Sequence, residues 1–215
     1  MVGIAVFSAL AFVVAFVCNI IPPVAGFLSL DVKDAVIAIA SFIYGPVSAV
    51  IISFIAAFIE LITFSTTGWY GFVMNFASSA VFSLTASLIY SRRRNINTAL
   101  IALASSVLAV TCVMLLLNIF VTPLYLAYIG VPTAVAKGQV AEMLPTVLLP
   151  FNFAKALLNS AVAMLLYKPV ATALKRIKLV SGDPTSLKLD KNTTTFLAIG
   201  GAALAVSIAV LVILA

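Results

Sequence analysis

Long apolar runs separated by short polar segments dominate the sequence. Residues 2–21 contain no charged side chain, and residues 47–64, 71–90 and 99–126 form three more runs with at most one charge each. A helix of about 20 apolar residues crosses the hydrocarbon core of a bilayer, and a charge at its centre costs at least a few kcal/mol. The pattern therefore predicts a transmembrane helix in each run.

Three further apolar segments and one loop complete the pattern. Residues 35–44 are apolar but end at Gly45-Pro46, so this segment is too short to span and is expected to be tilted, re-entrant or buried in protein. Residues 127–145 are expected to form a loop, because they carry several glycines, prolines and charges. A helix should follow from about Pro145 to Lys168, and residues 195–215 form a last apolar stretch. We therefore expect seven membrane segments, one of them short.

Two prolines lie inside these predicted helices. Pro123 is expected to kink or end the helix at residues 99–126, and Pro150 to bend the first turns of the next one.

The composition indicates that these helices belong to an all-α integral membrane protein. Of the 215 residues, 64% are hydrophobic and 8% charged, and the mean hydropathy is +1.28. The absence of histidine excludes a His-based active site or metal site. Cys18 and Cys112 lie in apolar runs and are interpreted as small hydrophobes, so no metal site and no cofactor is expected.

The distribution of Lys and Arg predicts the orientation. Three arginines at residues 92–94 and six basic residues between 168 and 191 follow the fourth and sixth segments, whereas Lys33 and Lys137 alone fall in connections on the other side. Basic residues are retained in cytoplasmic loops, so the amino terminus is predicted to be cytoplasmic. The net charge of +6 is explained in the same way, and no nucleic-acid partner is expected.

Polar residues inside the apolar runs gather towards the predicted outer surface. Asn152, Lys155 and Asn159 fall within a 60° arc of one helix at 100° per residue, so their side chains point the same way. Asn118 and Thr122 are four residues apart and share another face. Because intramembrane polar groups mark functional sites, these residues predict a ligand pocket open to the outside.

Other interpretations of single residues stay open. Any one asparagine could only hydrogen-bond a neighbouring helix, and Glu60 could line the pocket, pair with Lys155 or be a solvated helix-end residue. Asp31 and Asp34 could stabilise a helix dipole. Trp69 and Tyr70 could belong to an interfacial aromatic belt or touch a ligand.

No enzyme is predicted, because no catalytic set is found. The sequence contains no phosphate-binding Gly-x-x-x-x-Gly-Lys-[Ser/Thr] loop and no Gly-x-Ser-x-Gly elbow. Uphill transport of a solute would therefore depend on an ion gradient or on a separate ATPase.

Four motifs make the chain similar to a known family. They are residues 27–34 (Phe-Leu-Ser-Leu-Asp-Val-Lys-Asp) followed by Gly45-Pro46, residues 71–75 (Gly-Phe-Val-Met-Asn), Asn118 with Thr122-Pro123, and residues 149–155 (Leu-Pro-Phe-Asn-Phe-Ala-Lys) with Asn159. Over about residues 3–180 the chain resembles the substrate-binding S component of energy-coupling factor transporters, most closely the riboflavin-specific type. The sequence departs from the usual pattern at Lys33, where a small polar residue is common.

The resemblance implies a six-helix membrane domain at residues 1–180, with a linker at 181–194 and an added seventh helix at 195–215. It implies a prokaryotic plasma-membrane protein that binds a vitamin near the outer surface and docks on a transmembrane coupling protein carrying two cytoplasmic ATPases. Docking would use an Ala-x-x-x-Ala pattern in the first helix, best matched by Ala5 and Ala9. The substrate-binding residues it implies are Asn152, Lys155, Asn118, Asn159, Thr122, Asn75, Asp31, Leu30 and Glu60.

Riboflavin is the favoured ligand, because the amide side chains of Asn118, Asn152 and Asn159 suit the alternating donors and acceptors along one edge of an isoalloxazine ring. An S component for pantothenate, biotin or thiamine is the alternative, since Lys155 could face a carboxylate and Glu60 a cationic ring. A non-transporting membrane scaffold subunit and an ion-coupled carrier are the rivals from other classes.

Overall fold

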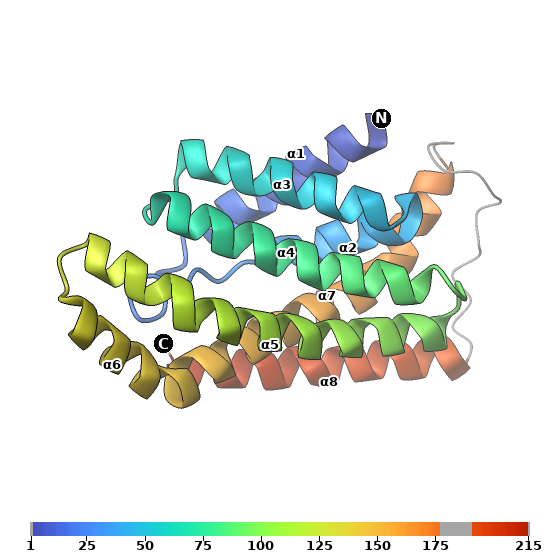
Figure 1. Ribbon diagram of the computed structural model, residues 1–215. Coiled ribbons are helices and arrows are strands. Elements are labelled where there is room, and N and C mark those ends of the chain that lie inside the picture. Colours follow the sequence, from blue (N-terminus) through green and yellow to red (C-terminus); the bar gives the residue numbers. More distant parts are fainter. Residues whose placement is uncertain (1, 177–190, 215) are drawn as a thin grey trace.

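The molecule is a bundle of helices, seen in a computed structural model that describes residues 2–176 and 191–214 (Figure 1). The helices are α1 (Val2–Cys18), α2 (Lys33–Tyr44), α3 (Pro46–Thr63), α4 (Gly68–Tyr90), α5 (Ile96–Tyr128), α6 (Thr133–Met143), the π-helical turn η1 (Leu144–Leu148), α7 (Leu149–Arg176) and α8 (Lys191–Leu214). Within the described residues, five stretches are long and apolar enough to cross a membrane: α3, α4, α5, Thr133–Tyr167 and Thr194–Leu214. The prediction of an all-α membrane protein is confirmed.

The short helix α2 lies at the centre of the bundle. It packs against α1, α3, α4 and α7, and every residue from Lys33 to Phe42 is buried. Gly45 ends the helix with a φ of 92°, which is open to glycine at little cost, and Pro46 starts α3 at its first helical position. The expectation that this segment is buried in protein is confirmed.

The structure narrows one prediction about a proline and corrects one about a loop. Pro123 lies inside α5, which continues to Tyr128, so of the two expected effects, a kink or an end of the helix, the second is excluded. The predicted loop at 127–145 contains α6, which starts directly after Pro132 and packs on α5 with Ala136 and Val140 buried. The glycines and charges of this segment suggested a loop, but most of its residues are good helix formers and its apolar positions find a partner.

A π-helical turn joins α6 to α7, so the helical backbone continues between them without a break. The turn η1 contains Pro145 and ends two residues before Pro150, and neither proline has a backbone N–H to donate. A π-turn changes the hydrogen-bond register locally, and such turns are frequent at functional sites. The residues that follow, Asn152 and Lys155, line the pocket described below.

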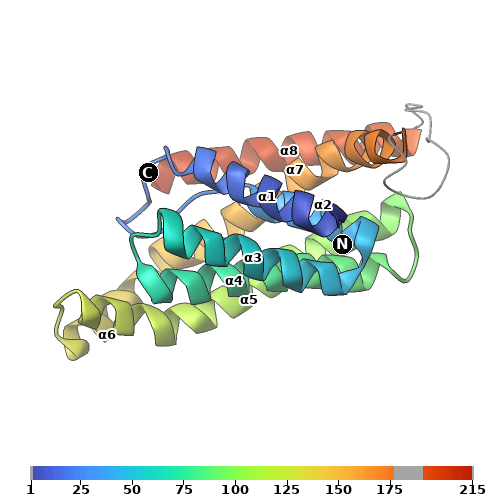
Figure 2. The ribbon, with the colours of Figure 1, turned by 90° about the horizontal axis from the view of Figure 1, so that it is seen from above.

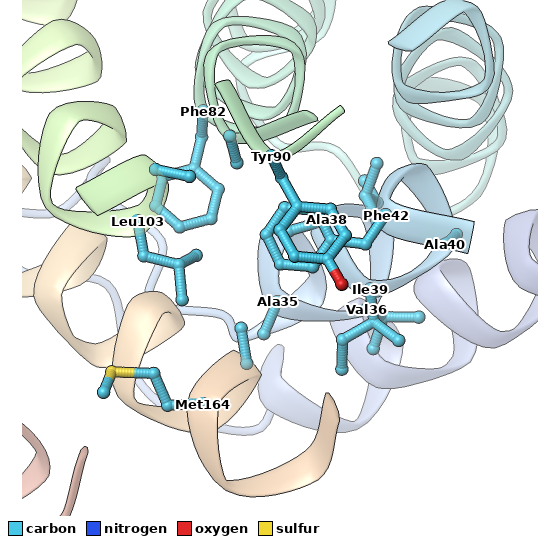
Figure 3. Packing of buried hydrophobic residues seen from close by; sticks show 14 of the residues in the cluster. Ala35, Val36, Ala38, Ile39, Ala40, Phe42, Phe82, Tyr90, Leu103 and Met164 are labelled. Carbon is cyan, nitrogen blue, oxygen red and sulfur yellow. The ribbon is translucent and has the colours of Figure 1, made fainter. Parts of the chain in front are cut away.

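The core lies where α2 meets α4, α5 and α7 (Figure 3). The rings of Phe42 and Tyr90 have centroids 4.3 Å apart, and the Tyr90 and Tyr167 hydroxyl oxygens are 2.5 Å apart. Serines allow a close approach of α2 and α4, and the Ser87 hydroxyl donates to the Ser41 carbonyl at 2.9 Å. These contacts hold α2, α4 and α7 together, and the same core reaches the pocket at Met114.

The helix α8 packs along α7, as both ribbon views show (Figures 1 and 2). Phe196, Ser207 and Leu211 are buried, and an added Cβ at Gly200 would lie 3.3 Å from Met164 Cβ. Residues 181–190 of the predicted linker lie outside the described residues, and the helix begins at Lys191, a few residues before the predicted 195. The division into separate domains stays a prediction.

We predict that Gly200→Leu destabilises the protein, because the new side chain would force α8 away from α7, at about 1–3 kcal/mol. Gly201→Leu is the matched control, since nothing lies within 4 Å of a Cβ at that position. Melting temperatures in detergent should fall for the first variant and stay near the wild type for the second. Equal melting of both variants would contradict the packing of α8 described here.

Candidate ligand-binding site

A pocket opens at the end of the bundle where α3 ends and α4 begins, here called the pocket end. Its empty space of about 650 Å³, part of it open to solvent, is within the usual range of small-molecule sites. One wall is the loop between α1 and α2, and the others are α4, α5 and α7. The lining residues are Phe27, Leu28, Ser29, Thr67, Tyr70, Gly71, Met74, Asn75, Ser78, Met114, Asn118, Val121, Thr122, Tyr125, Phe151, Asn152 and Lys155.

The two amides of α5 and α7 have fixed orientations. Asn118 donates from Nδ2 to the Met114 carbonyl at 2.7 Å and accepts from the Thr122 hydroxyl at 2.7 Å. Asn152 donates from Nδ2 to the Leu148 carbonyl at 2.7 Å. Each amide group is therefore held by its own helix, and its remaining acceptor capacity is available to a ligand.

Lys155 ties the loop between α1 and α2 to α7. Its Nζ lies 2.8 Å from Asp31 Oδ2 and 3.0 Å from the Ser29 carbonyl oxygen, and both ionic side chains are largely buried. Glu60 therefore does not pair with Lys155, which was one of the interpretations left open. Nζ has no third hydrogen-bond partner among the described residues, so one of its three protons is available to a ligand.

Asn159 lies beneath the pocket and not on its lining. It accepts from the Ala35 backbone N–H at 2.8 Å and donates to the carbonyls of Asp31 and Lys155, each at 3.0 Å. Because Ala35 is in the first turn of α2, this amide satisfies an N–H that has no partner within the helix. In this structure Asn159 holds the start of α2.

Glu60 pairs with Lys33, a residue that the sequence analysis placed in an outside connection. Lys33 is 1% exposed, and its Nζ lies 2.6 Å and 2.7 Å from the two carboxylate oxygens of Glu60. The placement of Lys33 was wrong, because α2 begins at this residue and carries it into the bundle. The signal that could have found it is a lysine directly before a run of apolar residues too short to span.

A second hollow lies next to the pocket. It has about 850 Å³ of empty space including open solvent, and its lining includes Leu30, Asp31, Glu60 and Asn75. Asn75 alone of these four also lines the first pocket. The predicted site residues therefore divide: Asn75, Asn118, Thr122, Asn152 and Lys155 line the pocket, whereas Leu30, Asp31, Glu60 and Asn159 surround it.

Aromatic side chains line the pocket mouth. Tyr70 and Tyr125 both line it, with ring centroids 6.0 Å apart, and Phe27 packs against Tyr125 at 6.2 Å. Trp69 is 67% exposed and is not part of the lining, as is typical of a residue in an interfacial belt. Of the two interpretations, Tyr70 fits ligand contact and Trp69 fits the belt.

The fold and the pocket define the class of protein. It is a helical membrane protein with a small-molecule site at one end, lined by polar side chains and by aromatic residues at its opening. The family described as "ECF transporter, substrate-specific component" matches residues 1–167, and the chain belongs to this family.

Two curated relatives cover most of the chain. The riboflavin transporter RibU of Staphylococcus aureus (strain TCH60) is 32% identical over 178 residues, which are 82% of this chain and 93% of that protein. The riboflavin transporter FmnP of Bacillus subtilis (strain 168) is 24% identical over 170 residues, 78% of this chain and 89% of that protein.

One solved structure is similar throughout the same region. It is described as "Structure and mechanism of the S component of a bacterial ECF transporter", and it matches with a TM-score of 0.64 and 31% identity over 81% of this chain and 96% of that chain. The family assignment from the sequence motifs is confirmed.

We predict that Asp31→Asn destabilises the protein by about 3–5 kcal/mol, because it leaves the Lys155 ammonium buried without its counter-charge. The melting temperature in detergent, without ligand, measures the effect. Asp31→Asn combined with Lys155→Met removes both charges and should recover most of the loss. A single variant that melts like the wild type would show that the pair does not hold the loop.

Proposed function

We propose that this chain is the riboflavin-binding S component of an energy-coupling factor importer in the plasma membrane of a prokaryote. The observation that carries the proposal is the pocket, where Asn118, Asn152 and Lys155 meet an aromatic mouth at one end of the bundle. Both curated relatives are riboflavin transporters by name, which supports the same ligand.

The chemistry of riboflavin fits this lining. Along one edge the isoalloxazine ring offers two carbonyl acceptors on either side of an N–H donor, and its dimethylbenzene end is apolar. The Lys155 ammonium can donate to a ring carbonyl, and an asparagine carbonyl oxygen can accept from the N–H. Tyr70, Tyr125 and Phe151 offer aromatic surface to the ring faces.

The charges around the pocket weigh against the other vitamins. Biotin or pantothenate would bring a carboxylate, but the Lys155 charge is already matched by Asp31. A thiamine ring would need a carboxylate facing it, yet Asp31 and Glu60 each pair with a lysine and neither lines the pocket. A neutral ligand with hydrogen-bonding groups agrees best with this balance.

Transport requires partners that supply energy, and the proposal assigns them to a transmembrane coupling protein and two cytoplasmic ATPases. The basic residues at 92–94 and 168–191 support a cytoplasmic amino terminus. Ala5 and Ala9 are exposed on α1, whereas Ala11 and Ala15 are buried inside the bundle. The exposed pair is therefore the one free to meet a partner helix closely.

Titration of the detergent-purified protein with riboflavin should show saturable quenching of flavin fluorescence at one site per chain, because aromatic and amide groups would enclose the ring. Asn152→Ala should weaken binding by about 1–3 kcal/mol, since a ligand donor would lose its acceptor in a dry site.

The control variant for this titration is Asn95→Ala, which removes an amide at the far end of the bundle that caps α5. It should bind riboflavin like the wild type. Absence of saturable quenching by the folded wild type, together with binding of pantothenate or biotin, would overturn the choice of ligand.

Replacing both Ala5 and Ala9 with Trp should abolish ATP-driven riboflavin uptake by the assembled transporter, because two large side chains would block close helix contact. Binding of riboflavin by the isolated variant should be unchanged, since neither residue lines the pocket. Leu10→Trp, at an exposed position about 100° around α1 from Ala9, serves as the control for bulk alone. Uptake that survives in the double variant would show that this face does not dock, and loss of riboflavin binding would place it in the core or the binding site instead.

A further inference from the structure

Asn75 forms part of the wall between the pocket and the second hollow, since it lines both. On the side of the second hollow its Nδ2 donates to Glu60 Oε2 at 3.1 Å. Its Oδ1 accepts no hydrogen bond within residues 2–176 and 191–214. The two ends of the amide therefore differ: one N–H of the NH₂ group is bonded to Glu60, and the carbonyl oxygen is unused.

The charge state of Glu60 determines which end of the Asn75 amide faces the Glu60 carboxyl group. Glu60 is 3% exposed, and both of its carboxylate oxygens accept hydrogen bonds from the Lys33 ammonium. An ionised carboxylate has no proton to donate, so only the NH₂ end of Asn75 can face it favourably. The amide carbonyl oxygen is then the end left for a group in the pocket, which Asn75 also lines.

We propose that Lys33 and Glu60 are positioning residues that make Asn75 a hydrogen-bond acceptor for the ligand. The pair does not touch the ligand, and it acts through the orientation of one amide. The inference rests on the proposed function and deepens it, because it names residues that select a ligand carrying an N–H or O–H donor at this wall.

A second amide of the pocket has the same arrangement, with its NH₂ group bonded to the protein and its carbonyl oxygen unbonded. Asn152 also donates from Nδ2, to the Leu148 carbonyl at 2.7 Å, and its Oδ1 accepts no hydrogen bond within the described residues, so that oxygen is available to a ligand donor. Lys155 supplies the donor between the protein and a ligand carbonyl. The pocket thus combines fixed acceptors with one cationic donor, and an isoalloxazine edge with a ribityl chain offers matching groups of both kinds.

The isosteric substitution Glu60→Gln should reverse the orientation of the Asn75 side-chain amide. The Lys33 ammonium can only donate, so it would hold the carbonyl oxygen of the new glutamine and leave the glutamine NH₂ facing Asn75. Asn75 would then turn its carbonyl oxygen to this NH₂ and its own NH₂ to the pocket. A ligand donor would meet a donor, and affinity for riboflavin should fall roughly 10- to 100-fold.

Asn75→Asp combined with Glu60→Gln should restore the original polarity. An aspartate accepts at both oxygens, so one can accept from the NH₂ of the introduced glutamine while the other faces the pocket. The double exchange also keeps the number of carboxylates in this group of contacting residues unchanged. We expect the double variant to bind riboflavin within about 3-fold of the wild type, a rescue that a purely structural role of Glu60 would not produce.

The test is a double-mutant cycle of riboflavin affinity in detergent on wild type, Glu60→Gln, Asn75→Ala, Glu60→Gln/Asn75→Ala and Glu60→Gln/Asn75→Asp. Glu60→Gln should weaken binding in the wild-type background and have no effect once Asn75 is alanine. Melting temperatures show whether each variant is folded. If Glu60→Gln does not fold, Lys33→Met takes its place. A buried Glu60 without its lysine would become neutral, and its carboxyl group could then donate a hydrogen bond to Asn75.

The outcomes separate the two proposals. A wild type that binds no riboflavin overturns the proposed function. If the wild type binds riboflavin, any one of three results overturns the positioning role of Lys33 and Glu60. The affinity of Glu60→Gln could equal that of the wild type, or Glu60→Gln could still weaken binding when Asn75 is alanine. The third such result is that Asn75→Asp does not restore the affinity lost in Glu60→Gln.

Discussion

The pocket end of the molecule depends on two buried ion pairs that meet at the start of α2. Asp31 with Lys155 joins the loop after α1 to α7, and Lys33 with Glu60 joins α2 to α3. Removing one member of such a pair leaves an uncompensated charge in a dry environment, which costs several kcal/mol. The two pairs therefore hold the short central helix, the loop above it and the floor of the pocket in one arrangement.

The remaining polar groups at this end follow from that arrangement. Asp34, in the first turn of α2, accepts hydrogen bonds from the hydroxyls of Ser78 and Ser79 on α4. Asn159 joins the start of α2 to α7 through three hydrogen bonds. With its charges matched and its amides held, the pocket offers a ligand a set of oriented groups, so little reorganisation is needed on binding.

Much of the fold could be predicted from the sequence, because transmembrane helices follow directly from apolar length and charge placement. The helix at 133–143 was missed since glycine and charge suggested a loop, whereas contact with α5 stabilises a helix there. The pairing of the buried charges could not be predicted, because it depends on which helices are neighbours. Spacing on one helix placed Asn152, Lys155 and Asn159 on a common face, but their different depths separate a pocket residue from one that holds α2.

The structure of the protein with riboflavin bound tests the central claim most directly. The account predicts that the isoalloxazine ring lies between the loop at residues 27–29 and α7, with its polar edge at Asn118, Asn152 and Lys155. Asn75 should then present its carbonyl oxygen to the ligand while its NH₂ stays on Glu60. A ring found in the second hollow, beside Asp31 and Glu60, would contradict the assignment of the pocket.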